Sequence, residues 1–326
     1  MGSSKIFNSK KEIKNYPMNF NGKDINPKSL NASKTPSGVG AYLSLVTFAH
    51  TIFAMPFAII GFALGLRALN FTTYKPWWEL LMLVLLCMIF ARSAAMAFNR
   101  WLDAEFDAKN PRTAVREIPS GVITKRNAIL FVILSCFAFL TTTYFINALC
   151  LVLAPVALFV ILFYSFTKRF TSLCHIVLGL GLSLAPIGAY IAVTGKFSLV
   201  PVLFSLSVIC WVSGFDIIYA LQDIEFDKAN NLRSIPSRLG MKRALRISEY
   251  LHVLSFTAIA FAGIIGHFSW FYWCGAAIFA YFLIYQHRLV KPTDLSKVNR
   301  AFFTSNGIAS VVFSLFVLTD IFITYH

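Results

Sequence analysis

Long runs of apolar residues recur along almost the whole chain, and they constrain its fold more than any other feature. Of the 326 residues, 57% are hydrophobic and only 13% are charged, which excludes an ordinary soluble domain. A helix needs about 20 residues to cross a bilayer. Nine runs approach that length, at residues 40–66, 77–99, 127–146, 148–166, 173–194, 199–221, 245–266, 268–286 and 301–323. We therefore predict an all-α fold, a polytopic membrane bundle of nine transmembrane helices.

The N-terminal segment differs from everything that follows it. Residues 1–37 are rich in Lys, Asn and Ser and contain only isolated apolar residues. Such a segment cannot bury enough apolar surface to order itself. We expect a polar, flexible tail over residues 1–37 and one intramembrane domain over residues 38–326.

Basic residues gather in alternate connections between the runs. The chain has 29 Lys and Arg against 14 Asp and Glu, a formal charge of +15, but this charge lies beside predicted membrane spans and does not indicate a nucleic-acid partner. The positive-inside rule places these connections and the N-terminus in the cytoplasm, and the C-terminus outside. All six Cys residues fall within the predicted spans, where we expect small buried side chains and no disulfides.

Two of the basic connections resemble each other. The sequence DAEFDAKN at 103–110 corresponds to DIEFDKAN at 223–230, and an Ile-Pro-Ser tripeptide follows each, at 118–120 and 235–237. A repeat of this kind indicates a duplicated unit of about four helices. We therefore expect two pseudo-repeated halves of four helices around a central cavity that both connections face.

Acidic and amide residues recur at helical spacing in both connections. They are Asn99, Asp103 and Asp107 in the first, and Asp216, Asp223 and Asp227 in the second. On a helix such spacings put the side chains on one face, where like charges repel by a few tenths of a kcal/mol per exposed pair. One such pair alone is an ordinary solvated helix end. Two equivalent pairs favour a bound cation, and oxygen ligands without nearby His or Cys favour Mg²⁺.

Asp216 and Arg92 each lie about two turns inside a predicted span, where an ionisable group is costly unless it serves a polar site. Asp216 either removes a proton from a substrate or supports the second metal site. Arg92 precedes Asn99 by seven residues on the same helical face. It either binds a substrate carboxylate or forms a structural salt bridge.

The two acidic motifs together resemble those of a known family. The patterns NxxxDxxxD from Asn99 and YAxQDxxxD from Tyr219 are similar to the two signatures of the UbiA superfamily of intramembrane prenyltransferases. Further similar segments are HTIFAMPFAIIG (50–61), ARSAAMAFNR (91–100), NPRTAVREIPSG (110–121) and YSFTKR (164–169). The resemblance implies a helical bundle whose cavity opens toward lipid. It also implies that Mg²⁺ binds a polyprenyl diphosphate through Asn99, Asp103, Asp107, Asp223 and Asp227.

The chemistry of such a transfer suggests roles for nearby cations and rings. Cleavage of the allylic C–O bond leaves a carbocation and a diphosphate anion, whose charge Mg²⁺ and basic side chains neutralise. The candidates for direct diphosphate contacts are Arg112, Arg116, Lys168 and Arg169, which otherwise only set the topology. Tyr164 is either a cation–π partner of the carbocation or an interfacial tyrosine.

We expect different roles for two of the histidines. His50 lies in the family-like segment 50–61 and is a candidate for the acceptor pocket. His175 is expected to be a hydrogen-bonded core residue.

The resemblance implies a hydroxylated aromatic carboxylic acid as acceptor, 4-hydroxybenzoate or 1,4-dihydroxy-6-naphthoate, in respiratory quinone biosynthesis at the bacterial inner (plasma) membrane. Segment 50–61 departs from the RxDKPIG pattern of typical 4-hydroxybenzoate enzymes. It looks more like members from bacteria that make menaquinone by the futalosine route. No obligate protein partner is expected.

Two other classes compete with this interpretation. A CDP-alcohol-type lipid head-group transferase also uses intramembrane aspartates and a metal, but the DGxxAR string that this class carries before its aspartates is absent. A transporter is expected to have an inverted repeat and charges at the membrane midplane. Here the charges gather at one face.

Overall fold

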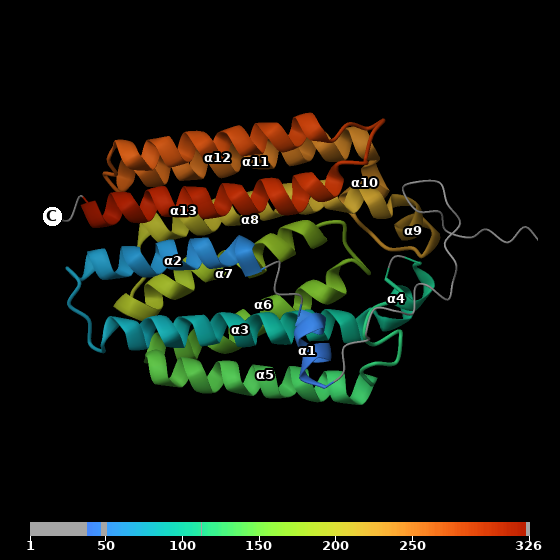
Figure 1. The fold of residues 1–326 in the computed structure, drawn as a ribbon, viewed down its shortest axis with the longest axis horizontal. Helices are drawn as coiled ribbons and strands as arrows, with labels where there is room; N and C mark the ends of the chain where they lie inside the picture. Colours follow the sequence, from blue (N-terminus) through green and yellow to red (C-terminus); the bar gives the residue numbers. More distant parts are fainter. Residues whose placement is uncertain (1–37, 47–50, 112, 324–326) are drawn as a thin grey trace, which may run out of the picture.

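Long helices run roughly parallel to one another, and short helices gather at one end (Figure 1). The computed structural model describes residues 38–46, 51–111 and 113–323. In chain order the helices are α1 (Val39–Val46), α2 (Thr51–Ala68), α3 (Trp77–Leu102), α4 (Ala104–Lys109), α5 (Lys125–Ile146), α6 (Ala148–Thr167), α7 (Cys174–Thr194), α8 (Leu199–Ala220), η3 (Leu221–Asp223), α9 (Ile224–Ala229), α10 (Ile235–Leu239), α11 (Met241–Ile265), α12 (Trp270–Leu289), η4 (Arg300–Ser305) and α13 (Asn306–Ile323). These ranges contain no strand.

The predicted all-helical membrane bundle is confirmed, but its count of nine spans is not. Within the described ranges, seven helical segments are long and apolar enough to cross a bilayer. Helix α12 is not among these seven segments. Helix α2 is not among them either, because its apolar stretch Phe53–Ala68 is shorter than a span. The first predicted span, 40–66, includes residues 47–50, which lie outside the described ranges, as does the predicted tail over residues 1–37.

An aromatic cluster around Trp211 packs α8 against helices from both halves of the chain. The ring of Trp211 is fully buried and lies 5.4 Å from Phe57 of α2 and 5.6 Å from Phe279 of α12, measured between centroids. Its Nε1 donates a 2.9 Å hydrogen bond to Asn306 Oδ1 of α13, so the polar edge of the indole is satisfied as well. Helix α8, which carries Asp216, is therefore held on several sides.

Helices α2 and α7 approach each other at Gly61. A Cβ atom at this position would lie 2.0 Å from the backbone oxygen of Pro186, so only glycine permits the contact. Small residues allow such close backbone approach between membrane helices. Helix α7 is thus packed against α2 on one side and α8 on the other.

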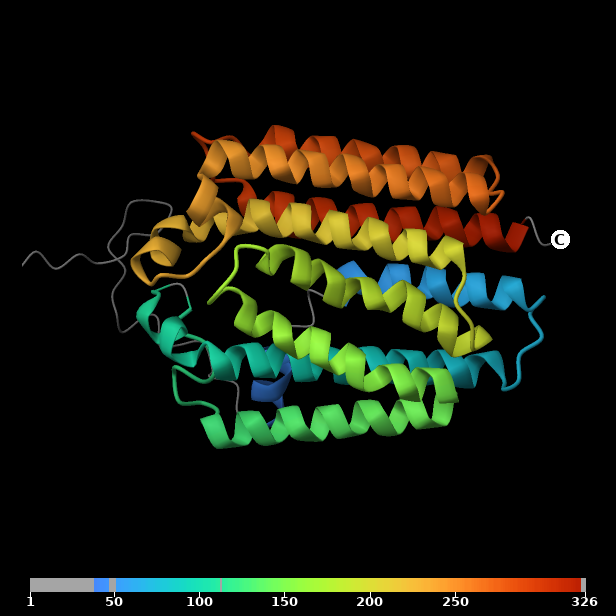
Figure 2. The same cartoon turned by 180° about the vertical axis from the view of Figure 1, so that it is seen from behind.

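The two acidic segments lie at the same end of the bundle. Both views place α4, α9 and α10 there, whereas α13 ends at Ile323 at the opposite end (Figures 1 and 2). The arrangement agrees with the predicted alternation of connections. The orientation in the membrane remains a prediction.

Candidate active site

The first acidic segment is a bent helix and not the continuous one that the spacing suggested. Helix α3 ends at Leu102, and Asp103 (φ −91°, ψ 5°) precedes α4. Hydrogen bonds continue across the bend, from Asp103 N to Asn99 O (2.9 Å) and from Asp107 N to Asp103 O (2.8 Å). The side chain of Asn99 also donates from Nδ2 to Asp103 Oδ2 at 3.1 Å. The bend therefore keeps the three residues together while it redirects the chain.

The second acidic segment repeats this geometry. Asp223 (φ −105°, ψ 7°) precedes α9 as Asp103 precedes α4. Asp107 and Asp227, four residues further on, are 6% and 0% exposed, and Glu105 and Glu225 are both exposed. The similarity between the two sequences therefore extends to backbone and burial, as a duplicated unit predicts.

Each of three aspartates pairs with a basic side chain. Arg116 Nη1 lies 2.7 and 2.9 Å from the two carboxylate oxygens of Asp107. Lys168 Nζ lies 2.6 Å from Asp227 Oδ1, and Arg169 Nη2 lies 3.2 Å from Asp103 Oδ1. Such pairing is required for Asp227, because a fully buried carboxylate is stable only with a partner.

The position of Lys168 depends on contact between two connections. The backbone N–H of Arg233 donates to Lys168 O at 2.7 Å, and Arg233 Nη1 donates to Phe170 O at 2.7 Å. The α6–α7 connection is thereby attached to the segment that follows α9. The first half of the chain thus supplies a cation to the aspartate of the second.

Burial and pairing change the acid–base properties at the membrane boundary. Burial raises the pKa of the Asp103 carboxyl above its ordinary value, and the opposing effect of Arg169 is smaller. Burial lowers the pKa of the Lys168 ammonium, but the attraction of Asp227 outweighs it, so this pKa lies above its ordinary value. Lys168 is therefore a permanent cation at neutral pH.

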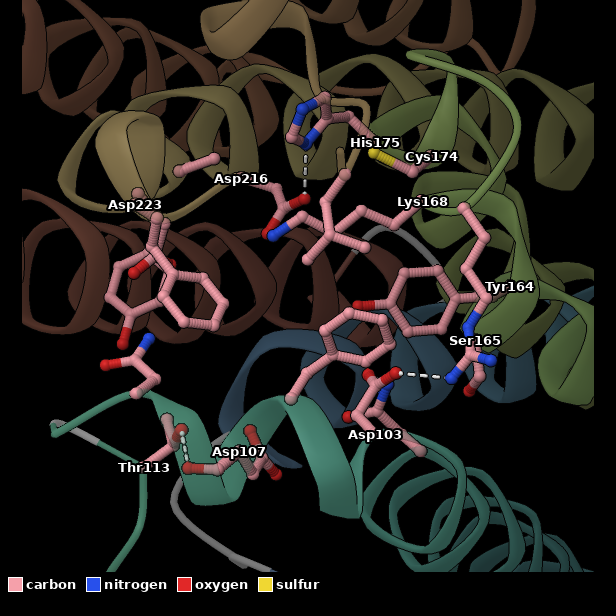
Figure 3. Close-up of a pocket in the computed structure, with 18 of the residues that line it drawn as sticks. Asp103, Asp107, Thr113, Tyr164, Ser165, Lys168, Cys174, His175, Asp216 and Asp223 are labelled. Atoms are coloured by element: carbon pink, nitrogen blue, oxygen red, sulfur yellow. Dashed lines mark hydrogen bonds and ion pairs between the residues drawn. The ribbon is translucent and has the colours of Figure 1, made fainter. Parts of the chain in front are cut away.

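Both acidic segments open on one cavity of about 200 Å³ (Figure 3). It is lined by Asn99, Asp103, Phe106, Asp107, Asn110, Thr113, Arg116, Tyr164, Ser165, Lys168, Arg169, Cys174, His175, Asp216, Tyr219, Ala220, Asp223, Phe226 and Leu232. The structure thus brings together most of the residues that the sequence singled out. It does not bring Arg92 or the fully buried Asp227 to the cavity wall, and His50 and Arg112 lie outside the described residues.

Tyr164 and Ser165, at the end of α6, contribute a different kind of surface. The ring of Tyr164 points into the space between Asp103 and Lys168 (Figure 3). Ser165 Oγ is buried and has no hydrogen-bond partner in the described part of the chain. A ligand in the cavity would satisfy it. Sequence analysis missed Ser165, because a serine in an apolar helix usually bonds its own backbone.

His175 is the main functional candidate that the sequence did not reveal. As expected, it is a buried, hydrogen-bonded residue, with an exposed fraction of 2%. Its partner, however, is Asp216: Nδ1 lies 2.6 Å from Asp216 Oδ2, and both side chains line the cavity (Figure 3). The only signal in the sequence was a histidine at the start of an apolar run, just after Lys168 and Arg169.

The donor atoms around the cavity fit a hard cation. Within the described ranges, no three His, Cys, Asp or Glu side chains are close enough to hold a metal on their own. Mg²⁺ commonly takes one or two carboxylates and fills its other positions with water and substrate phosphate. Asn99 and Asp103 on one wall, with Asp223 on the other, offer oxygen atoms of the kind that this mode requires.

Comparisons with known proteins identify the family of this chain. The family model described as the UbiA prenyltransferase family matches residues 54–307. The 4-hydroxybenzoate octaprenyltransferase of Francisella tularensis subsp. novicida is 29% identical over 232 residues, which cover 71% of this chain and 81% of that protein.

Solved structures extend the comparison to the fold. The apo structure of a UbiA homolog from Aeropyrum pernix is 27% identical, with a TM-score of 0.71 over 84% of this chain and 98% of that one. A UbiA homolog from Archaeoglobus fulgidus bound to DMAPP and Mg²⁺ is 20% identical and shares the fold, with a TM-score of 0.70 over 87% of this chain and 99% of that one. The family model covers most of the chain and the fold agrees with it, so the chain belongs to the UbiA prenyltransferase family and is a prenyltransferase.

Proposed function

We propose that this prenyltransferase uses Mg²⁺ to transfer a polyprenyl group from polyprenyl diphosphate to a hydroxylated aromatic carboxylic acid. The observation that carries the proposal is the convergence of two equivalent aspartate segments, with three basic side chains, on one cavity. Each of the three basic side chains already pairs with an aspartate, and the aspartates of the two segments outnumber them. The remaining carboxylate charge favours a divalent cation, and such a cation binds a diphosphate.

On the donor side, Asn99, Asp103, Asp107, Asp223 and Asp227 are the proposed metal ligands. When bound, Mg²⁺ supplies positive charge to the leaving diphosphate. Arg116, Lys168 and Arg169 border the same space and donate to its oxygens, as does Arg112 by its place in the sequence. Guanidinium and ammonium groups complement phosphate oxygens in this way.

The carbocation left by the departing diphosphate needs a surface that is electron-rich and dry. Tyr164 offers its ring face at the cavity wall one helical turn before Lys168. A cation over such a ring gains about 0.5–2 kcal/mol, most when it is desolvated. The ring also keeps water from the reactive carbon.

On the acceptor side, Asp216 accepts the proton that the aromatic ring or phenol loses. Arg92 lies on α3 seven residues before Asn99, about 10 Å deeper along the helix axis. A carboxylate that reaches Arg92 therefore belongs to an acceptor that extends beyond the described cavity toward the bundle interior. His50 is the further candidate for that pocket.

The proposed acceptors are 4-hydroxybenzoate and 1,4-dihydroxy-6-naphthoate, both hydroxylated aromatic acids. The name of the Francisella relative supports the first, and the departure of segment 50–61 from the RxDKPIG pattern supports the second. Either product belongs to respiratory quinone biosynthesis. We place the enzyme in the bacterial inner membrane, with its N-terminus and both aspartate segments in the cytoplasm.

An assay in membranes tests the proposal. Labelled geranyl or longer prenyl diphosphates are incubated with each acid, with the corresponding decarboxylated phenols, and with a CDP-alcohol substrate, with and without Mg²⁺. We expect Mg²⁺-dependent prenylation of at least one acid. Prenyl transfer to none of the acids, or equal transfer after chelation, would contradict the proposal.

A further inference from the structure

The histidine beside Asp216 is fixed in one tautomer by its surroundings. His175 Nδ1 lies 2.6 Å from Asp216 Oδ2, and Nε2 accepts a hydrogen bond from the backbone N–H of Ile235 at 3.3 Å. A nitrogen that accepts from an amide carries no proton itself. The ring proton therefore lies on Nδ1, and the imidazole donates it toward the carboxylate.

The amide that fixes His175 is itself held in place. Ile235 is the first residue of α10, and Ser234 before it caps this helix: Ser234 Oγ accepts from Ser237 N, and Ser237 Oγ accepts from Ser234 N. Ser234 Oγ also donates to Asp227 Oδ2 at 2.8 Å. A continuous set of contacts thus runs from Asp227, through Ser234 and Ile235, to His175 and Asp216.

Asp216 differs from the other paired aspartates of the cavity. Asp103, Asp107 and Asp227 each face a permanent cation. The partner of Asp216 donates one hydrogen bond to one oxygen, Oδ2. The carboxylate is oriented by that bond, and its other oxygen is left for a proton.

We propose that His175 is a positioning residue that orients Asp216 as the proton acceptor for the aromatic substrate, and that the Ile235 amide fixes His175 for this task; the proposal rests on the function proposed above. In the transfer step, the allylic C–O bond breaks and its electron pair leaves with the diphosphate. A ring carbon forms the new C–C bond. The proton of that carbon passes to Asp216 Oδ1, and the C–H electron pair restores the aromatic ring.

His175 itself does not take the proton onward. Nδ1 already carries a hydrogen, and Nε2 is engaged with Ile235 N–H. Removal of the imidazole therefore leaves the base in place but no longer oriented. The expected consequence is slower proton removal with little change in the binding of the diphosphate donor.

Two substitutions of the histidine separate orientation from packing. His175→Leu fills the space without a donor, whereas the amide nitrogen of His175→Asn takes the position of Nδ1 and donates to Asp216. We measure kcat, the KM of each substrate, and the kinetic isotope effect with a ring-deuterated acceptor. His175→Leu should lower kcat about 10-fold to 100-fold, leave the donor KM unchanged and raise the isotope effect, because proton removal becomes rate-limiting. His175→Asn should restore most of kcat and the wild-type isotope effect.

A third substitution acts without touching the imidazole. Ile235→Pro removes the N–H at the first position of α10, where proline is well tolerated. It should move kcat and the isotope effect in the same direction as His175→Leu, by less. The matched control is His252→Leu, at a buried histidine of α11 that pairs with His287. It should lower thermal stability without changing the isotope effect.

The outcomes separate this proposal from the proposed function. A wild-type enzyme that prenylates none of the acids refutes the function. Wild-type activity, with an unchanged isotope effect in both His175→Leu and Ile235→Pro, refutes the positioning role. The same holds if the loss lies in the donor KM, or if His175→Asn is as impaired as His175→Leu although it is folded. If neither His175 variant folds, an unchanged isotope effect in Ile235→Pro alone refutes it.

Discussion

The two aspartate segments have nearly the same structure but different surroundings. In both, a helix bends at an aspartate, and a second aspartate one turn later is buried against a cation. The residue seven positions before the bend is Met96 in the first segment and Asp216 in the second. The residue four positions before it is Asn99 in the first and Tyr219 in the second.

The two Ile-Pro-Ser tripeptides also have different surroundings. In the second half the tripeptide forms the start of α10 and contacts His175 through Ile235 N. In the first half Ile118 is buried in an apolar cluster with Ala97 and Ala104. The two aspartate segments are thus similar, but only the second lies beside the His175–Asp216 pair. We infer that both segments hold the donor, while only the second acts on the acceptor.

The largest expected effect comes from removing either aspartate at a bend. Asp103→Ala and Asp223→Ala should each lower turnover more than about 1,000-fold, because on the proposed function both segments hold the Mg²⁺ that neutralises the diphosphate. The matched controls are Glu105→Ala and Glu225→Ala, at exposed acidic positions two residues further on. These should change turnover less than about twofold, since an exposed charge contributes little. Substantial turnover in either aspartate variant, if it is folded in detergent, would contradict the prediction that both segments are required.

The second expected effect concerns the cations. Lys168→Met should raise the donor KM about 10-fold to 100-fold and lower stability by about 2–4 kcal/mol, because Asp227 is left buried without its partner. Arg116→Leu should act in the same way with a smaller loss of stability, since Asp107 keeps slight solvent contact. Steady-state kinetics and thermal unfolding in detergent check both. A larger change in acceptor KM than in donor KM would reverse the assignment.

The third expected effect tests the acceptor side at Arg92. If Arg92 binds the acceptor carboxylate, Arg92→Leu should raise the KM of the aromatic acid about 10-fold, as for a lost charge-assisted hydrogen bond, and leave the donor KM unchanged. The decarboxylated phenol should then lose its disadvantage against the acid. Weaker donor binding with an intact preference for the acid would instead assign Arg92 to the diphosphate. A variant that fails to fold would assign it to a salt bridge.

The smallest change in activity is expected for two cysteine variants that test the membrane topology. Glu105→Cys and Glu225→Cys should retain activity, and both should react with a membrane-impermeant thiol reagent from the same, cytoplasmic side. Cys274 is exposed and not buried as the sequence suggested, so it is replaced by serine in both variants. The chain that keeps Cys274 and both glutamates is the background control. Labelling of the two positions from opposite sides would contradict a shared cavity.

Much of this architecture could be predicted from local sequence. The apolar runs predicted the helices, and the repeated acidic segments predicted that both connections face one cavity, which Asp103, Asp107 and Asp223 line. The bend at Asp103 could not be predicted, because four-residue spacing fits a straight helix equally well. The predicted count of nine spans is not confirmed, in part because α12 mixes apolar with polar aromatic and basic residues.

The side-chain pairs of the cavity could not be predicted, because they depend on tertiary contacts. His175 and Asp216 are 41 residues apart, and neither position alone indicates a pair. The match of Lys168 to Asp227, and of Arg169 to Asp103, likewise follows from how connections dock and not from spacing. The roles proposed from the sequence for His50 and Arg112 stay predictions.

Donor binding without turnover most directly tests the inference that both segments hold the donor while Asp216 acts only on the acceptor. The affinity of an unreactive prenyl thiolodiphosphate is measured with and without Mg²⁺ for the wild type and for Asp103→Asn, Asp223→Asn and Asp216→Asn. We predict that the first two variants lose most of the Mg²⁺-dependent affinity, about 10-fold or more, and that Asp216→Asn stays within about twofold of the wild type. An Asp216→Asn variant that loses as much affinity as Asp223→Asn would place Asp216 in the metal site and contradict the account.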